Sequence, residues 1–403
     1  MPYHRFLAIR GAEGEPLWTK ESGEAAPPHD AAAAAAVTEA LHLATTKEEV
    51  HADFSVVLRE PSSGGPLVLD GSAGEGGGQI LRTALTLAMA TGTPFVLEKI
   101  RAGRKKPGLM RQHLTCVKAA ALISDAELEG ADIGSTRLVF RPKAVRAGEH
   151  TVDIGSAGAV SLVLQTVALP LAVAAGASRI TVRGGTHALW APPFPFLAEA
   201  WLPLVRRAGA NLDLDLRSPG FYPAGGGEVV MSTAGGATLA PLHLDEQRAV
   251  GLLELRAIVA QLPEGIARRE LATAAELLTG QKLTTTSETV RSPGPGNAMW
   301  LVARDEGTGT TNVFSGIGDV GVAAEKIGED VARAFLAWRA SGASIEEHLA
   351  DQVMLPIALA GAGSFTTNVL SLHARTNIEV IAAFTGRRLR AYRLGDDRFR
   401  LEL

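Results

Sequence analysis

Three segments of this 403-residue chain follow a common pattern, and that repetition constrains the fold more than any other feature. Each segment reads as a short apolar strand, then a turn rich in glycine and serine, then a long apolar helix. The segments are "LVLDGSAGEGGGQILRTALTLAMATG" from Leu67, "HTVDIGSAGAVSLVLQTVALPLAVAAG" from His150 and "LADQVMLPIALAGAGSFTTNVLSLHARTNIEVIAAFTG" from Leu349. Such recurrence is typical of internal structural repeats. The sequence therefore predicts an α/β fold, with a large domain built from repeated layers of sheet and helix.

A stretch of different texture, residues 246–340, separates the second segment from the third. It alternates strand-like and helix-like runs and can bury a core of its own, so we predict an inserted small α/β domain there. The large domain then comprises residues 62–245 plus 341–403. Residues 1–61 form an N-terminal extension of unknown role, in which a run of six alanines favours a helix over residues 30–44.

Composition narrows the class of protein further. Hydrophobic residues make up 46% and charged residues 20% of the chain, as in globular proteins, and no uninterrupted apolar run is long enough to predict a transmembrane helix. The first residues lack a signal-type apolar segment, and the single cysteine, Cys116, fits a reducing compartment, so we expect a cytoplasmic protein. The net charge of -4 gives no general nucleic-acid signature, so a polyanion has to bind at a local patch.

One local patch of positive charge exists at residues 101–113, "RAGRKKPGLMRQH". Pro107 and Gly108 give this loop a defined shape, and arginines in a fixed loop can bind phosphate with two hydrogen bonds each. We therefore predict phosphate binding here, with a solvated charged face as the alternative. A helix is expected from Gln112 and His113 onward, with Cys116 as a buried, inert thiol.

The glycine-rich turn "SAGEGGGQILRTA", residues 72–84, matches neither the Walker loop nor the dinucleotide-binding fingerprint. Its glycines still permit close approach of a ligand, and a helix that begins near Gln79 leaves N–H groups free for an anion. Glu75 opposes a bare phosphate unless a divalent metal lies between them. Arg82 can serve a phosphate or pair with an acid, and a plain structural turn is an equal alternative.

Three further motifs stay open on residue chemistry alone. The glycines of "GFYPAGGGEVV", residues 220–230, indicate a bulge or a close backbone approach. The segment "RGGTHALWAPPFPFL", residues 183–197, suits either core packing or stacking on a flat base. In "SLHARTN", residues 371–377, His373 is either structural or a nucleophile that attacks phosphorus, because no catalytic trio or zinc spacing accompanies it.

Taken together, these blocks resemble the RNA 3'-terminal phosphate cyclase family, in its catalytic branch. The resemblance runs from about Pro66 to the C-terminus, with the blocks in the family's order. The matching strings are "DGSAGEGGGQILRTAL", "IRAGRKKPGLMRQHLT", "GGTHALWAPPFPFL", "GFYPAGGGEV", "HLADQVMLPIALAGAGSFTTN" and "SLHARTNI". It implies a large domain of three sheet-and-two-helix units, similar to enolpyruvate transferases, with a small α/β domain inserted before the last unit.

The resemblance also implies a three-step, ATP-dependent reaction. A histidine attacks the α-phosphate of ATP, which gives a covalent histidine-AMP and pyrophosphate. AMP then passes to an RNA 3'-phosphate, and the neighbouring ribose 2'-OH displaces it to form a 2',3'-cyclic phosphate. The implied partners are ATP, Mg²⁺ or Mn²⁺, and RNA with a 3'-phosphate end, with no membrane; a homodimer is left open.

Residue by residue, the resemblance implies these roles. His373 is the adenylated nucleophile, Asp351 an acid beside it, Arg82 a further catalytic residue and Glu75 the metal ligand. Four positions around the nucleotide and terminal phosphates are Arg101, Arg104, Gln112 and His113. Four that line the nucleotide base and sugar are Gln165, Pro192, Phe196 and Gln352. The chain departs from the family twice: Pro219 stands where Arg or His is usual, and His348 replaces the base-stacking tyrosine.

Two alternatives belong to other classes of protein. A cyclase-like protein without catalysis would bind RNA during ribosome assembly, but such relatives lack the histidine that stands at position 373 here. A small-molecule transferase like the enolpyruvate enzymes would use the basic loop for a phosphosugar and would have no need of a covalent histidine.

Overall fold

The computed structural model describes residues 8–10, 16–19, 48–59, 65–247 and 249–403. The chain divides into two compact units, Met1–Glu48 and Glu49–Leu403. In the first unit, strands β1 (Ala8–Arg10) and β2 (Pro16–Thr19) pair antiparallel. The helix predicted over residues 30–44 lies outside the described residues.

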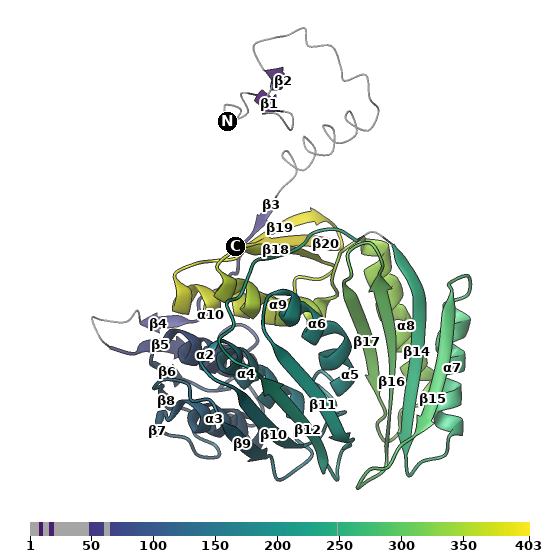
Figure 1. Ribbon diagram of the computed structural model, residues 1–403, viewed down its shortest axis with the longest axis horizontal. Coiled ribbons are helices and arrows are strands. Elements are labelled where there is room, and N and C mark those ends of the chain that lie inside the picture. Colours follow the sequence, from purple (N-terminus) through teal and green to yellow (C-terminus); the bar gives the residue numbers. More distant parts are fainter. Residues whose placement is uncertain (1–7, 11–15, 20–47, 60–64, 248) are drawn as a thin grey trace. The chain divides into compact units, whose positions relative to one another are not determined.

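The second unit is a mixed α/β structure of several small sheets with helices, so the predicted fold class is confirmed (Figure 1). Its first sheet has the strand order β4-β5-β6-β8-β7. These strands are β4 (Val57–Arg59), β5 (Leu67–Asp70), β6 (Phe95–Glu98), β7 (Glu127–Glu129) and β8 (Leu138–Arg141). The parallel strands β5 and β6 are joined by helix α2 (Gly78–Thr91), and α3 (Arg111–Ser124) follows β6.

The second sheet repeats this plan, with the order β11-β12-β10-β9. Its strands are β9 (Glu149–Asp153), β10 (Ser178–Gly184), β11 (Leu212–Ser218) and β12 (Gly227–Thr233). Helix α4 (Val160–Val173) joins the parallel strands β9 and β10. After β10 come α5 (Phe194–Phe196), the π-helical turn η1 (Leu197–Trp201) and α6 (Leu202–Arg207).

The third sheet has the order β13-β18-β20-β19, with β3 (Glu48–Val50) as its last strand. Its other strands are β13 (Leu242–Leu244), β18 (Gly363–Thr367), β19 (Arg390–Gly395) and β20 (Arg398–Glu402). Helices α9 (Glu347–Ala360) and α10 (Leu372–Thr385) flank β18 in the chain. The strand predicted at the start of the third repeated segment is wrong: "LADQVMLPIALA" is the helix α9, with Pro356 inside it, and the strand follows at "GSFTT". The apolar run there is helical because Glu346 caps it and Gly361 ends it in the left-handed conformation.

The fourth sheet, with the order β15-β14-β16-β17, has a hydrophobic core of its own. Its strands are β14 (Val250–Ala260), β15 (Leu283–Thr289), β16 (Gly296–Asp305) and β17 (Thr311–Ile317). Helices α7 (Gly265–Leu277) and α8 (Ala324–Ser341) pack together and on this sheet, and β17 lies against α5 and η1 (Figure 1). The domain boundaries stated above stay a prediction.

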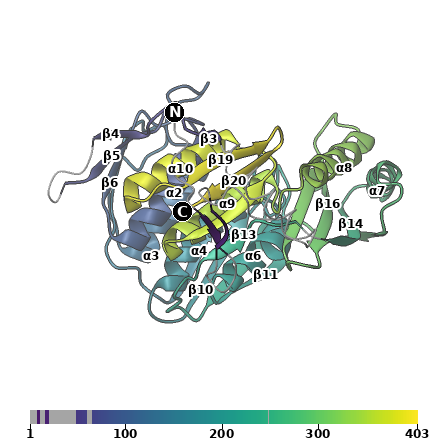
Figure 2. The ribbon, with the colours of Figure 1, turned by 90° about the horizontal axis from the view of Figure 1, so that it is seen from above.

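The helices of the three other sheets meet in one large apolar core. Helix α2 lies at its centre and packs against α10, α4 and α3, and α9 packs against α10; Figure 2 shows α2, α9 and α10 together. This packing brings the N-terminus of α2 next to α10, which follows nearly 300 residues later in the chain. Among the described residues, no helix is both long and apolar enough to span a bilayer.

Candidate functional site

The glycine-rich turn before α2 contacts helix α10. The backbone N–H of Glu75 donates a hydrogen bond of 3.1 Å to Oγ1 of Thr376. Gly74 has φ of +56°, and a Cβ there would lie only 2.7 Å from the Phe54 ring. The glycine is therefore required both by its left-handed backbone and by the close approach, and the turn fixes Glu75 beside the first turn of α10.

The basic loop, residues 101–113, also contacts Glu75. Arg104 donates to the Glu75 carbonyl oxygen at 2.7 Å and pairs with Oε1 of the Glu75 carboxylate. Arg101 instead donates to two carbonyls of its own loop, of Lys106 at 2.6 Å and of Gly108 at 3.2 Å. Arg101 therefore holds the shape of the loop, while Arg104 presents positive charge at the turn.

His113 on α3 is a neutral donor beside the N-terminus of α2. Its Nδ1 accepts a 3.1 Å hydrogen bond from the Met110 backbone, so Nε2 carries the proton. Burial, together with the charges of Arg82 and Arg101, lowers the pKa of His113 to about 3. Nε2 lies 2.7 Å from the position that a Cβ on Gly78 would take, so only glycine leaves room between the helix and this ring.

Arg82 is anchored in a buried polar network. It donates to Oε1 of Gln79 at 2.7 Å, and Nε2 of Gln79 donates to Oδ1 of Asn377 at 3.1 Å. Asn377 in turn donates to the Asp351 carbonyl at 3.0 Å. Burial lowers the pKa of Arg82, although a guanidinium stays charged at neutral pH. The network links α2, α10 and α9, and so fixes the direction of the Arg82 side chain.

His373 is the second residue of α10, two positions after the helix cap Ser371. Ser371 caps the helix by accepting from the Ala374 N–H at 2.9 Å, and its hydroxyl donates to Oδ1 of Asp351 at 2.9 Å. The His373 ring is half-buried and makes no hydrogen bond with any residue that the structure describes. Burial lowers the pKa of His373; the carboxylate of Glu75 acts against this, and the charges of Arg82 and Arg104 add to it. At neutral pH the imidazole is therefore uncharged, with a nitrogen lone pair free.

Helix α9 places a second group of side chains next to this histidine. Glu346 accepts from the backbone N–H of Leu349 at 2.6 Å and lies 3.0 Å from Nδ1 of His348. This carboxylate raises the pKa of His348, whose ring is exposed. Burial raises the pKa of Asp351 to about 7. His348, Asp351 and Gln352 share one face of the helix by their spacing of three and four.

The remaining predicted nucleotide positions differ in their surroundings. Gln165 on α4 and Gln112 on α3 are half-buried, and each has one amide atom with no partner among the described residues. Pro192 is partly exposed, whereas Phe196 is 2% exposed and belongs to the main core.

The structure brings Glu75, Arg82, Arg104 and His348 close enough to His373 to influence its charge. Phe196 presents no open ring face on which a base could stack.

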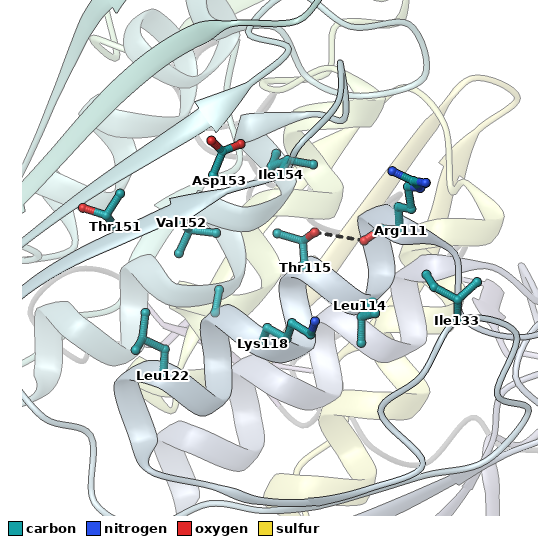
Figure 3. A pocket seen from close by; sticks show the side chains of 11 residues that line it. Arg111, Leu114, Thr115, Lys118, Leu122, Ile133, Thr151, Val152, Asp153 and Ile154 are labelled. Atoms are coloured by element: carbon teal, nitrogen blue, oxygen red, sulfur yellow. Dashed lines mark hydrogen bonds between the residues drawn. The ribbon is translucent and has the colours of Figure 1, made fainter.

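A cavity of about 520 Å³ runs along the outer face of α3 (Figure 3). Arg111 and Lys118 line it and form no ion pair with any described residue, and Leu122 and Ile133 are exposed apolar side chains of its wall. Free cations beside exposed apolar surface suit a phosphate backbone and its bases. Arg111 directly precedes Gln112 and His113 in the helix, so this cavity adjoins the predicted phosphate site.

Sequence reasoning missed the residues that hold the site together. Gln79, Ser371 and Glu346 orient the catalytic candidates. Two of them lie inside quoted motifs, but no sequence signal assigns any of the three a role of its own. Ser371 and Glu346 are types of residue that favour caps or first turns of helices, and each directly precedes the first residue of an observed helix. Gln79 gives no such signal, because its partner Asn377 is 298 residues away.

A divalent metal would fit at Glu75. Oε2 of Glu75 is buried without a partner among the described residues. No cluster of three or more His, Cys, Asp or Glu residues suited to a metal is found in the described part of the chain. One carboxylate oxygen suits an ion of the Mg²⁺ type, which takes its other ligands from water and from substrate phosphates.

The fold and the site together define a class of protein. It is a repeat-built α/β protein whose neutral histidine lies at the start of a helix, among arginines and one carboxylate. The family model "RNA 3'-terminal phosphate cyclase" matches residues 73–391. The chain belongs to the RNA 3'-terminal phosphate cyclase family.

Curated relatives agree with this assignment. The chain is 51% identical to the RNA 3'-terminal phosphate cyclase of Ralstonia nicotianae over 317 residues, which is 78% of this chain and 90% of that protein. It is 48% identical to the protein of the same name from Koribacter versatilis, over 79% of this chain and 89% of that protein. The Salmonella agona protein of that name is 44% identical, over 79% of this chain and 92% of its own. The recognition of the family from sequence is thereby confirmed.

Proposed function

We propose that this protein is an ATP-dependent RNA 3'-terminal phosphate cyclase that works through a covalent histidine-AMP. The observation that carries the proposal is the state of His373, which is uncharged, half-buried and free of hydrogen bonds with described residues, among Arg82, Arg104 and Glu75. A nucleophilic imidazole needs a free lone pair, and an attack on phosphate needs nearby positive charge. The curated relatives carry the name of this activity.

In the first step, a ring nitrogen of His373 attacks the α-phosphorus of ATP. The P–N bond forms as the bond to the β-phosphate oxygen breaks, and pyrophosphate leaves with the electron pair. Arg82 and Arg104 stabilise the negative charge that spreads over the phosphate oxygens. Because the Gln79 network already holds Arg82 in place, little reorganisation is needed at that moment.

In the second step, an oxygen of the RNA 3'-phosphate attacks the same phosphorus and the P–N bond breaks, so that the His373 ring is regenerated. In the third step the ribose 2'-oxygen attacks the 3'-phosphorus, loses its proton and expels AMP. Each step displaces a good leaving group, which is how covalent catalysis divides one difficult dehydration. Asp351 acts as a positioning residue in this scheme, because its described side-chain hydrogen bond is to Ser371, the cap that sets the entry of α10.

The metal and nucleotide roles follow from the same side chains. Oε2 of Glu75 would hold Mg²⁺ or Mn²⁺, which supplies Lewis-acid stabilisation of phosphate charge. His348 and Gln352 would contact the base and sugar of ATP, with Gln165 and Pro192 beside them. Phe196 supports this wall from the core, since its ring is buried.

The RNA end would be bound by the residues around α3. Arg104 and the Nε2–H of His113 would donate to its phosphate, with Gln112 beside them, while Arg101 keeps the loop in shape. The cavity along α3, with the free cations Arg111 and Lys118, would take the adjoining nucleotides (Figure 3). A homodimer and a cytoplasmic location stay predictions.

Intact-protein mass spectrometry tests the proposal. Incubation with ATP and Mg²⁺ or Mn²⁺ is expected to add the mass of one AMP group, and short RNA with a 3'-phosphate is then expected to remove it. RNA that ends in a 3'-hydroxyl should leave the adduct in place. RNA binding without any adduct would favour the non-catalytic alternative and contradict the proposal.

A further inference from the structure

A second cavity, of about 470 Å³, lies between the fourth sheet and the loop "GFYPAGGG". Its walls come from α7, from the start of β16, from the connection between β17 and α8, and from residues 221–223. None of the side chains assigned above to the nucleotide, metal or RNA phosphate lines it. The cavity is therefore separate from the site around His373.

A buried carboxylate oxygen without a partner is the main feature of this cavity. Glu270 on α7 is 0% exposed and Asn297 on β16 is 6% exposed. Nδ2 of Asn297 donates to Oε1 of Glu270, while Oε2 has no partner among the described residues. A buried polar atom that stays unbonded is unfavourable, so a ligand N–H group at this position would be stabilised.

Glu270 forms no ion pair with any residue that the structure describes. Burial raises the pKa of Glu270 to about 7, against the hydrogen bond from Asn297 and the attraction of Arg269. Arg269 itself pairs with Glu325 at 3.1 Å. No lysine lines the cavity, so the cavity offers no free positive charge that would hold a phosphate group inside it.

The rest of the wall suits a flat, uncharged ring. Ile266, Val322 and Ile327 supply apolar surface, and Phe221 lies beneath, stacked on His187 with 5.3 Å between ring centroids. Tyr222, at the mouth, is 70% exposed and offers an aromatic face. Flat heterocycles stack on such faces, and a carboxylate oxygen accepts from their amino groups.

We propose that this cavity binds a nucleobase, whose N–H group donates to Oε2 of Glu270 while its ring stacks on Tyr222. The inference deepens the proposed function and rests on it, because the natural source of such a base is RNA held at the His373 site. The loop that carries Tyr222 packs on the turn before α4: a Cβ on Gly225 would lie 2.9 Å from the Ala157 Cα. That turn adjoins Gln112, which donates to the Ala159 carbonyl at 3.0 Å, so these contacts connect α3 to the loop that carries Tyr222.

Fluorescence of 2-aminopurine, a base with an exocyclic amino group, tests the proposal on the full-length protein. RNA with a 3'-phosphate carries the probe at successive positions upstream of the end, and a parallel titration uses the free 2-aminopurine nucleoside. We expect one RNA position to be quenched on binding. Glu270→Gln should weaken that quenching about tenfold, because the amide then presents a donor to a donor.

Two further variants keep the test interpretable. Tyr222→Ala removes an exposed ring and should also weaken the quenching, whereas Glu276→Gln, an equal charge change on the exposed face of the same helix, should not. AMP addition from ATP should be unchanged in all three variants, which separates a failure here from a failure of the proposed function. Quenching by the nucleoside alone would still support a nucleobase site and would assign it to a free ligand. No quenching in either arm, or equal quenching in wild type and Glu270→Gln, would overturn the proposal.

Discussion

Glu75 and Glu270 have the same hydrogen-bonding pattern at their carboxylates but are surrounded by different side chains. Glu75 and Glu270 each have one carboxylate oxygen bonded and the other buried without a partner among the described residues. The bonded oxygen of Glu75 pairs with Arg104, and the Glu75 carboxylate also interacts electrostatically with Arg82 and Arg101. The bonded oxygen of Glu270 accepts a hydrogen bond from the neutral amide of Asn297. The cavity that Glu270 lines is largely apolar.

The difference shows how surroundings decide the chemistry of one side-chain type. Neighbouring arginines beside a carboxylate suit a site for a divalent metal and phosphates, whereas burial of a carboxyl group among apolar groups favours its protonated form. The pKa of Glu270 is accordingly raised to about 7. We therefore expect adenylation at the phosphate site to depend on side-chain charge and metal concentration. Binding in the cavity near Glu270 should depend on whether residue 270 can accept a hydrogen bond.

The largest expected effect is on the nucleophile of the charged site. His373→Ala should lower AMP addition by more than about a thousandfold, because no other group would carry the adduct. Mass spectrometry after incubation with ATP and metal measures it. His150→Ala, which changes a partly exposed histidine on β9, is the control and should form the adduct normally. A normal adduct on His373→Ala would exclude this residue as the nucleophile.

Glu75→Gln should have the next largest effect, since it removes the charge that would hold the metal. Adenylation should fall by about tenfold to a hundredfold at limiting metal and recover in part at high metal. The rate of adduct formation across a metal titration measures it, with the exposed Glu127→Gln as the matched control. An unchanged metal dependence would return the turn to a purely structural role.

Glu270→Gln should change stability in a pH-dependent way. Because the pKa of Glu270 is raised from 4.5 to about 7 in the folded protein, the folded state binds the extra proton and loses stability as pH rises through this range. The variant lacks this loss, so its free energy of unfolding relative to wild type should rise by about 2 kcal/mol between pH 5 and pH 8. Denaturant unfolding at several pH values measures it. Glu276→Gln should show no such slope, and a flat difference for Glu270→Gln would contradict the raised pKa.

The smallest expected effect is on the pH dependence of adenylation, in the acidic range where the rate falls because His373 becomes protonated. The pKa of His373 is lowered from 6.5, so the free imidazole persists below the pH at which an ordinary histidine is protonated. Arg104→Gln removes a positive charge that lowers this pKa, so this fall in rate should move to higher pH, by less than about one unit. Rates of adduct formation from pH 5 to pH 8 give the midpoint, with Lys118→Gln as the control. A shift to lower pH would contradict the assignment.

Local signals in the sequence predicted much of the fold. The helix expected at "RQHLTCVKAAALIS" is α3 at those residues, and the strands and helices expected after residue 246 include the fourth sheet. The third repeated segment was misread as beginning with a strand. An apolar run of that length fits a buried helix as well as a buried strand, and periodicity does not separate them.

Local signals such as turn residues, charge runs and motif strings are enough to predict the repeated α/β plan, the basic loop, the glycine turn and the candidate nucleophile His373. The packing of the folded chain was needed to show that Thr376 accepts a hydrogen bond from the N–H of Glu75, that Gln79 and Asn377 orient Arg82, and that Phe196 is buried. The same packing places Glu270 in the wall of a largely apolar cavity, beside residues about fifty positions away in the chain. These contacts depend on the packing of distant segments, and packing fixes burial and neighbouring charge, which set the pKa and the free hydrogen-bonding capacity of each group.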